Sequence, residues 1–142
     1  MPYPELMVAP MREELTQLGV KELKTGQDVD EFISAKDGTA LLLFNSVCGC
    51  AAGAARPAVA LSMQDENRPD QFISVFAGQD VEATEKARGY FPQLPPSSPS
   101  IVLLRNGEPT HYVPRHMIEG RDAQAIAGGL ADMFKELQDE EG

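Results

Sequence analysis

The amino-acid sequence predicts an α/β protein in which helices flank a central mixed β-sheet. Continuous apolar runs of strand length alternate with helical patterns through the centre of the chain, an order typical of this class. Near the end, the pair Asn106-Gly107 separates two further strand patterns and predicts an antiparallel hairpin. The length of 142 residues suits one domain, and no repeat or long linker divides the chain, so we expect a single domain over residues 1–142.

Helical patterns begin and end the chain. Residues 4–19 place apolar side chains at spacings of one, three and four, which predicts an N-terminal helical extension that Gly19 stops. The expected apolar face of this helix consists of Leu6, Met7, Met11, Leu15 and Leu18. Residues 122–138 predict the closing amphipathic helix, whose apolar side consists of Ile126, Leu130, Met133, Phe134 and Leu137.

The segments between these two helices predict the sheet and its covering helices. Residues 28–36 predict a short helix capped by Asp28, and the apolar run at 39–45 predicts a buried central strand. The remaining expected elements are a strand at 73–78, a helix at 79–91 capped by Asp80, a loop at 94–99 and the two hairpin strands within 100–113.

The two cysteines, Cys48 and Cys50, flank Gly49 directly after the strand predicted at 39–45 and before a helical pattern at 51–64. At a helix N-terminus, unpaired backbone N–H groups and the positive end of the helix dipole stabilise a thiolate and lower a cysteine pKa. Gly49 permits backbone conformations closed to other residues, which makes a bridge between the cysteines easier to close. Such a small ring departs from relaxed disulfide geometry, so it should be easily reduced and suited to thiol exchange.

Two other interpretations of the cysteine pair stay open. Unreacted cysteines are often buried as small apolar residues. A metal site would need about four ligands. Besides the two thiols the chain offers His111 and His116, but these lie beyond the first hairpin strand with no compact ligand spacing, so no metal is expected.

Charge and hydropathy argue against two classes of partner. Twelve lysines and arginines against 22 aspartates and glutamates leave a formal net charge of −10, which repels nucleic acid and anionic membrane surfaces. No segment reaches the roughly 18 consecutive apolar residues of a membrane span, and the N-terminal segment lacks the basic start and apolar core of a signal peptide. We therefore expect a cytoplasmic protein, where a close cysteine pair is more often catalytic, redox-sensing or metal-binding than structural.

The motifs along the chain resemble a known fold. A cysteine pair at a strand-to-helix junction, Pro57 inside that helix, Pro99 opening a later strand, then a hairpin and a closing helix, is the thioredoxin-fold arrangement. More narrowly, the chain resembles the bacilliredoxin family, small thioredoxin-fold proteins with a Cys-Gly-Cys motif. The stretches that carry this resemblance are NSVCGCAAGAARPA, VFAGQDVEAT, PPSSPSIVLL and PRHMIEGR.

The resemblance implies a function and a set of site residues. Members of this family remove bacillithiol, a low-molecular-weight thiol, from mixed disulfides on oxidised, S-thiolated cytoplasmic proteins, with the thiol as substrate and no bound cofactor. Cys48 matches the attacking cysteine and Cys50 its neighbour. Pro99 would be cis and lie against the cysteines, with the backbone at Ser98 available to pair with a substrate. Weak disulfide reductase or isomerase activity is an alternative use of the same pair.

The residues themselves also favour Cys48 as the attacking thiol, because it precedes the helix whereas Cys50 falls inside the first turn. Cys50 or an external thiol would then resolve the adduct. The competing class of function is non-enzymatic, a redox-sensing or protein-binding module on a thioredoxin scaffold whose cysteine oxidation changes its affinity for a partner.

Other polar residues near these motifs have weaker predicted roles. Arg56 and Arg115 are candidates for binding the carboxylates of a small thiol, as is His116. Asn45 and Ser46 are expected to satisfy backbone groups of a turn or cap rather than to do chemistry.

Overall fold

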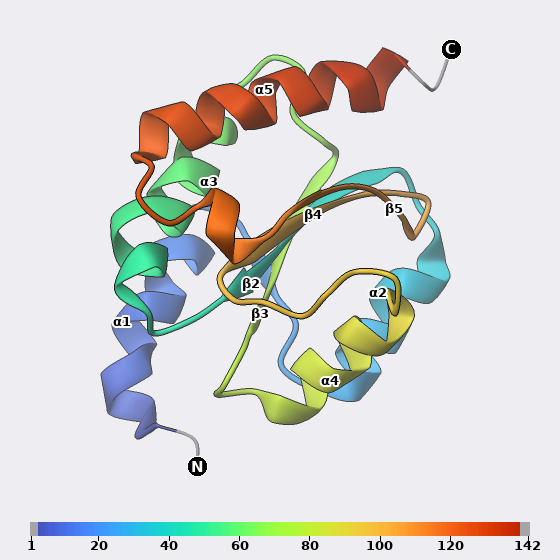
Figure 1. The fold of residues 1–142 in the computed structure, drawn as a ribbon. Helices are drawn as coiled ribbons and strands as arrows, with labels where there is room; N and C mark the ends of the chain where they lie inside the picture. The colour runs from blue at the N-terminus through green and yellow to red at the C-terminus, as the bar shows by residue number, and fades with distance from the viewer. Residues whose placement is uncertain (1–2, 140–142) are drawn as a thin grey trace.

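A computed structural model describes residues 3–139, in which five strands form one sheet with helices on both faces (Figure 1). The elements in chain order are α1 (Glu5–Thr16), β1 (Lys21–Glu22), α2 (Gly26–Ala35), β2 (Thr39–Asn45), the π-helical turn η1 (Ala51–Ala55), α3 (Arg56–Ser62), β3 (Gln71–Phe76), α4 (Val81–Tyr90), β4 (Ser100–Arg105), β5 (Glu108–Val113), the 3-10 turn η2 (Arg115–Met117) and α5 (Ala123–Asp139).

The strand order β1-β3-β2-β4-β5 makes β2 the central strand. β2 runs parallel to β3 and antiparallel to β4, while β1 is parallel to β3 and β5 antiparallel to β4, so the predicted mixed sheet is confirmed. The predicted hairpin is confirmed as well, because Asn106 and Gly107 both have positive φ, as a two-residue turn of this kind requires. β1 has only two residues, too few to leave a pattern in the sequence.

Buried apolar side chains form one cluster on each face of the sheet. Successive side chains of a strand point to opposite faces, so β2 contributes to both. Leu41 and Leu43 pack with α1, α3 and α5, whereas Leu42 and Phe44 pack with α2 and α4 (Figure 1). Among residues 3–139, no helix has the length and apolarity needed to cross a bilayer. The predicted face of the closing helix is confirmed, with Met133 partly buried and Ile126, Leu130, Phe134 and Leu137 fully packed.

The buried face of α1 differs from the predicted one. Only Leu15 of the predicted face is buried, and Leu6 is 92% exposed. The residues of α1 that face the interior are instead Val8, Arg12 and Leu15. The prediction considered apolar side chains only, whereas the buried face of this helix includes the charged side chain of Arg12.

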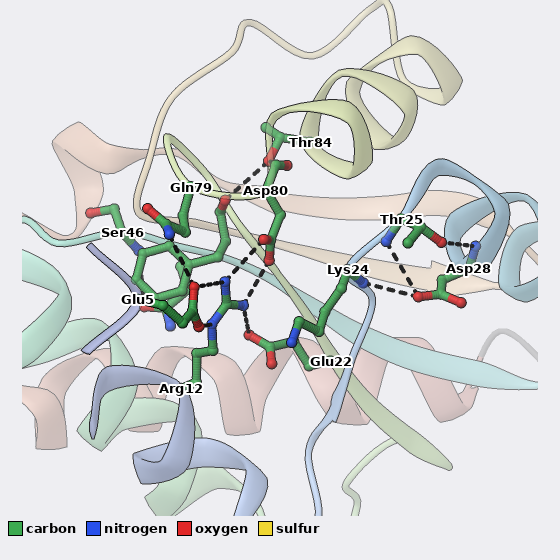
Figure 2. A network of polar contacts seen from close by, with 12 residues as sticks. Glu5, Arg12, Glu22, Lys24, Thr25, Asp28, Ser46, Gln79, Asp80 and Thr84 are labelled. Atoms are coloured by element: carbon green, nitrogen blue, oxygen red, sulfur yellow. Dashed lines mark hydrogen bonds and ion pairs between the residues drawn. The ribbon is translucent and has the colours of Figure 1, made fainter. Parts of the chain in front are cut away.

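Arg12 is 7% exposed because three carboxylates surround its guanidinium (Figure 2). Its Nε donates to Glu5 at 2.7 Å, its Nη1 to Glu22 at 2.5 Å, and Nη1 and Nη2 to the two oxygens of Asp80 at 2.7 and 2.9 Å. The guanidinium also lies over the ring of Phe76, 5.2 Å from its centre. These contacts join α1 to β1 and to the end of β3.

The same network corrects the predicted cap of α4. Asp80 occupies the position before α4, yet its side chain makes no capping hydrogen bond, because its carboxylate binds Arg12. The cap of α2 also differs from the prediction. Thr25 is the N-cap and accepts the Asp28 N–H at 3.0 Å, while the Asp28 carboxylate accepts the N–H of Thr25 in return (Figure 2).

Replacement of Arg12 by methionine is expected to lower the free energy of unfolding by about 3 kcal/mol, because removing the buried cation leaves the largely covered carboxylates of Glu22 and Asp80 without a partner. Lys86→Met is the matched control, since the Lys86–Asp30 pair is exposed and 3.3 Å long, and it should cost far less. Urea denaturation of both variants measures the difference. Equal losses would mean that Arg12 does not anchor α1.

Candidate functional site

The turn that carries the cysteines begins where β2 ends. The side chain of Asn45 accepts the N–H of Ser46 at 2.9 Å, and the hydroxyl of Ser46 accepts the N–H of Cys48 at 3.0 Å. The prediction that Asn45 and Ser46 satisfy backbone groups of this turn is confirmed. Together they fix the direction in which the chain leaves the sheet.

The helix that follows starts at Gly49, so Cys48 is the residue just before it. The carbonyl of Cys48 accepts the N–H groups of Ala51 at 2.9 Å and Ala52 at 3.3 Å. The next turn, η1, is a π-helical turn that leads into α3, where Pro57 is among the first two residues. The sequence predicted this helix but not its widened turn. Cys48 therefore lies at a helix N-terminus, as expected.

Two donors contact the sulfur of Cys48. The backbone N–H of Cys50 donates to it at 3.4 Å, and Nη2 of Arg115 donates to it at 3.1 Å. These contacts lower the pKa of Cys48 below that of an ordinary cysteine, with the Cys50 N–H as the largest cause and the Cys50 thiol, the charge of Arg115 and the Ala51 N–H as further causes. Cys48 is thus the thiol that more readily becomes a thiolate.

Cys50 has the opposite character. Its pKa is raised, chiefly by its hydrogen bond to Cys48 and then by burial, by the negative charge of Cys48 and by the carboxylate of Glu119. Both cysteines are free thiols and both are partly exposed. The pair therefore consists of one thiol whose pKa is lowered and a neighbouring thiol whose pKa is raised.

Arg115 follows the last residue of β5, Val113, and its side chain reaches the cysteines from there. Its Nη1 donates to the carbonyl of Ser98 at 3.3 Å while Nη2 contacts Cys48, so one guanidinium joins two predicted site segments. The side chain is 41% exposed and pairs with Glu119 at 3.4 Å. The Ser98–Pro99 peptide bond is cis, as the resemblance implied.

Arg56 lies behind the cysteine turn rather than beside the thiols. It is only 2% exposed, and its guanidinium donates to Glu14 at 3.0 Å, to the Asn45 side chain at 2.9 Å and to the Ser46 carbonyl at 2.9 Å. A role in binding the substrate stays a prediction for Arg56. Its contacts tie the turn at Asn45 and Ser46 to Glu14 of α1.

The two histidines lie apart. His111 bonds Glu136 of α5 at 2.7 Å and Thr110 at 2.9 Å, whereas His116 is an exposed residue of η2. Within residues 3–139 no three side chains of the His, Cys, Asp and Glu types form a group that could hold a metal ion. Glu119 is a site residue that was not predicted from the sequence, although its i, i+4 spacing from Arg115 could have indicated the ion pair between them.

The sheet order, the cysteine turn and the cis-proline loop define a thioredoxin-fold protein. Solved structures agree: thioredoxin of Fasciola hepatica has a TM-score of 0.57 at 18% identity, covering 82% of this chain and 98% of that one. A family model described as disulphide isomerase matches residues 3–137.

The chain belongs to the bacilliredoxin family. A bacilliredoxin of Salinibacter ruber is 56% identical over 137 residues, which cover 95% of this chain and 81% of the relative. A bacilliredoxin of Shouchella clausii is 50% identical over 134 residues, covering 94% and 92% of the two chains. Family and fold together support a thiol-disulfide oxidoreductase-like role.

Replacement of Arg115 by glutamine should raise the pKa of Cys48, because it removes a positive charge that favours the thiolate. Alkylation by iodoacetamide reports the thiolate, and below the midpoint of its pH profile the rate should fall about three- to tenfold. The assay uses Cys50→Ser protein so that only Cys48 reacts. Arg121→Gln is the control, since Arg121 is exposed and its guanidinium donates to the Met117 carbonyl at 3.4 Å rather than to a cysteine. Equal profiles for the two arginine variants would contradict the role of Arg115.

Proposed function

We propose that this protein removes bacillithiol from mixed disulfides on oxidised, S-thiolated proteins of the cytoplasm, with Cys48 as the attacking thiolate. The observation that carries the proposal is the contrast between the two thiols. Donors from Arg115 and the Cys50 backbone meet the Cys48 sulfur and lower its pKa, while the pKa of Cys50 is raised. Thiol exchange needs one thiolate to start the reaction, and this arrangement supports that role for Cys48.

In the first step the Cys48 thiolate attacks the bacillithiol sulfur of the mixed disulfide. A new disulfide bond forms between Cys48 and bacillithiol, the old sulfur–sulfur bond breaks, and the client leaves as a thiolate that takes up a proton from water. No electrons are gained or lost overall, because one disulfide is exchanged for another. The client is restored to its reduced form.

In the second step a thiolate must release bacillithiol from Cys48. If Cys50 attacks the Cys48 sulfur, an internal disulfide forms and bacillithiol leaves as a thiolate; if an external thiol attacks the bacillithiol sulfur, Cys48 is freed directly. Modification of Cys48 removes its negative charge, which is among the causes that raise the pKa of Cys50. Cys50 therefore becomes more acidic just when a second thiolate is needed.

The segments around the thiols suit a small anionic thiol attached to a protein. Arg115 is the partly exposed cation beside Cys48 and would bind carboxylates of the small thiol as the adduct forms. Ser98 and Pro99 would present backbone to the client segment. Arg56 is buried behind the turn, so in this proposal it holds the turn in place through Asn45 and Ser46. No bound cofactor or metal takes part.

The two cysteine variants should behave differently. Cys48→Ser is expected to lose removal of bacillithiol from a modified client, because a serine hydroxyl is almost wholly un-ionised near neutral pH. Cys50→Ser should still make the first attack and then accumulate as an adduct on Cys48. Intact-protein mass spectrometry measures the adduct as a mass increase of one bacillithiol that a reductant reverses.

The same assay separates the alternatives. An adduct on Cys50 in the Cys48→Ser protein would reverse the two roles, and no adduct in either variant would contradict the exchange mechanism. Turnover distinguishes an enzyme from a redox-sensing module: with external thiol present, the wild type should process many equivalents of client, whereas a sensor would stop after one.

A further inference from the structure

Three hydroxyl groups, those of Ser97, Ser100 and Tyr112, form hydrogen bonds in the loop that precedes Pro99. The hydroxyl of Tyr112, on β5, donates to the carbonyl of Pro95 at 2.5 Å and lies 2.9 Å from the hydroxyl of Ser97. The hydroxyl of Ser100 donates to the carbonyl of Ser97 at 2.8 Å. The backbone N–H of Arg115 donates to the Ser97 hydroxyl at 3.1 Å.

The directions of these hydrogen bonds follow from counting protons. The Arg115 N–H can only donate, and the Pro95 carbonyl can only accept. Because the single proton of Tyr112 goes to Pro95, the Ser97 hydroxyl donates to the oxygen of Tyr112 and accepts from Arg115. The result is one directed chain, Arg115 to Ser97 to Tyr112 to Pro95, with every proton used.

Apolar packing holds the two ends of this loop, because Leu94 packs against the core on the α2 and α4 side and Pro99 is buried. A small hollow open to solvent lies between the loop and the core and is lined by Phe44, Phe91 and Val102 together with Ser97 and Tyr112. Pro95 and Pro96 also line this hollow and are exposed to solvent. Between these two packed residues, the hydrogen-bonded chain holds Ser97, and Arg115 holds the carbonyl of Ser98.

We propose that Ser97 and Tyr112 are positioning residues for Arg115, whose guanidinium they bring to the Cys48 sulfur. The Arg115 backbone is held by Ser97, and its Nη1 is held by the carbonyl of Ser98, the next residue of the same loop. While these two hydrogen bonds hold the backbone and Nη1 of Arg115, its Nη2 lies 3.1 Å from the Cys48 sulfur. Ser97 and Tyr112 touch neither sulfur in the contacts observed, so they act through Arg115.

The charged and titratable groups around Cys48 are Arg115, Cys50 and, through Arg115, Glu119. A change in the hydroxyl chain leaves all three side chains present and alters only where the guanidinium is held. A merely structural role for Tyr112 would change stability, whereas the proposed role changes the pH dependence of Cys48. This inference rests on the proposed role of Cys48 as the attacking thiolate.

The test compares iodoacetamide alkylation of Cys48 across pH in the Cys50→Ser background. Tyr112→Phe keeps the ring and removes the hydroxyl, and it should slow alkylation about twofold below the midpoint, less than Arg115→Gln does. Ser97→Ala should act in the same direction, and Ser97→Thr, which keeps a hydroxyl, should restore the wild-type profile. Tyr90→Phe is the matched control, because the Tyr90 hydroxyl donates to Asp30 at 2.6 Å on α2.

Adding Tyr112→Phe to Arg115→Gln decides the mechanism. If Tyr112 acts through Arg115, the double variant should match Arg115→Gln alone. Two results would overturn the proposal. One is an unchanged alkylation profile in folded Tyr112→Phe protein; the other is that Tyr112→Phe slows alkylation equally when Arg115 is present and when it is replaced by glutamine. Bacillithiol removal is measured separately on a modified client, so its failure would contradict the proposed function while the alkylation profiles still test the positioning role.

Discussion

The contact between the Arg115 guanidinium and the Cys48 sulfur depends on the register of the central sheet. On β2 and β4, Phe44 pairs with Ser100, so the residues after Phe44 and those before Ser100 leave the sheet at the same end. On β4 and β5, Ile101 pairs with Val113, which brings the segment after β5 to that end as well. A slip of one residue in either pairing would turn the strand side chains to the opposite face of the sheet and shift the segments that carry the site residues.

Buried arginines support this end of the sheet in a protein whose formal net charge is −10. Arg12 joins α1 to the end of β3 through Phe76 and to the start of α4 through Asp80, and Arg56 joins α1 to the end of β2 through Glu14, Asn45 and Ser46. The two guanidinium groups thus hold the two parallel strands, at their carboxyl ends, to the same helix. The excess of carboxylates supplies the partners that allow these cations to be buried.

Much of the fold could be predicted from the sequence because its signals are local. The run at 39–45, the Asn106-Gly107 turn and the apolar face of α5 each follow from neighbouring residues and each is confirmed. The face of α1 could not be predicted in this way, because Arg12 turns inward to meet Asp80, 68 residues further along the chain.

In the candidate site, too, the features set by neighbouring residues could be predicted and those set by distant residues could not. The position of Cys48 before a helix, and the turn contacts of Asn45 and Ser46, are local and were predicted. That Arg115 would reach Cys48 while Arg56 turned inward could not be read from the sequence, since both are arginines near a predicted motif. Their different surroundings come from contacts with distant elements, Glu14 for one and the loop at Ser98 for the other.

The spacing of the cysteines explains why the two thiols differ. With one residue between them, Cys48 lies outside the helix while Cys50 lies inside its first turn, so the backbone N–H of Cys50 is free to donate to the Cys48 sulfur. The same closeness allows the Cys50 thiol to hydrogen-bond to Cys48 and places it beside the negative charge of Cys48, and both effects raise the pKa of Cys50. The short spacing thus lowers the pKa of Cys48 and raises the pKa of Cys50. Modification of the Cys48 sulfur removes its negative charge and with it one cause of the raised pKa of Cys50.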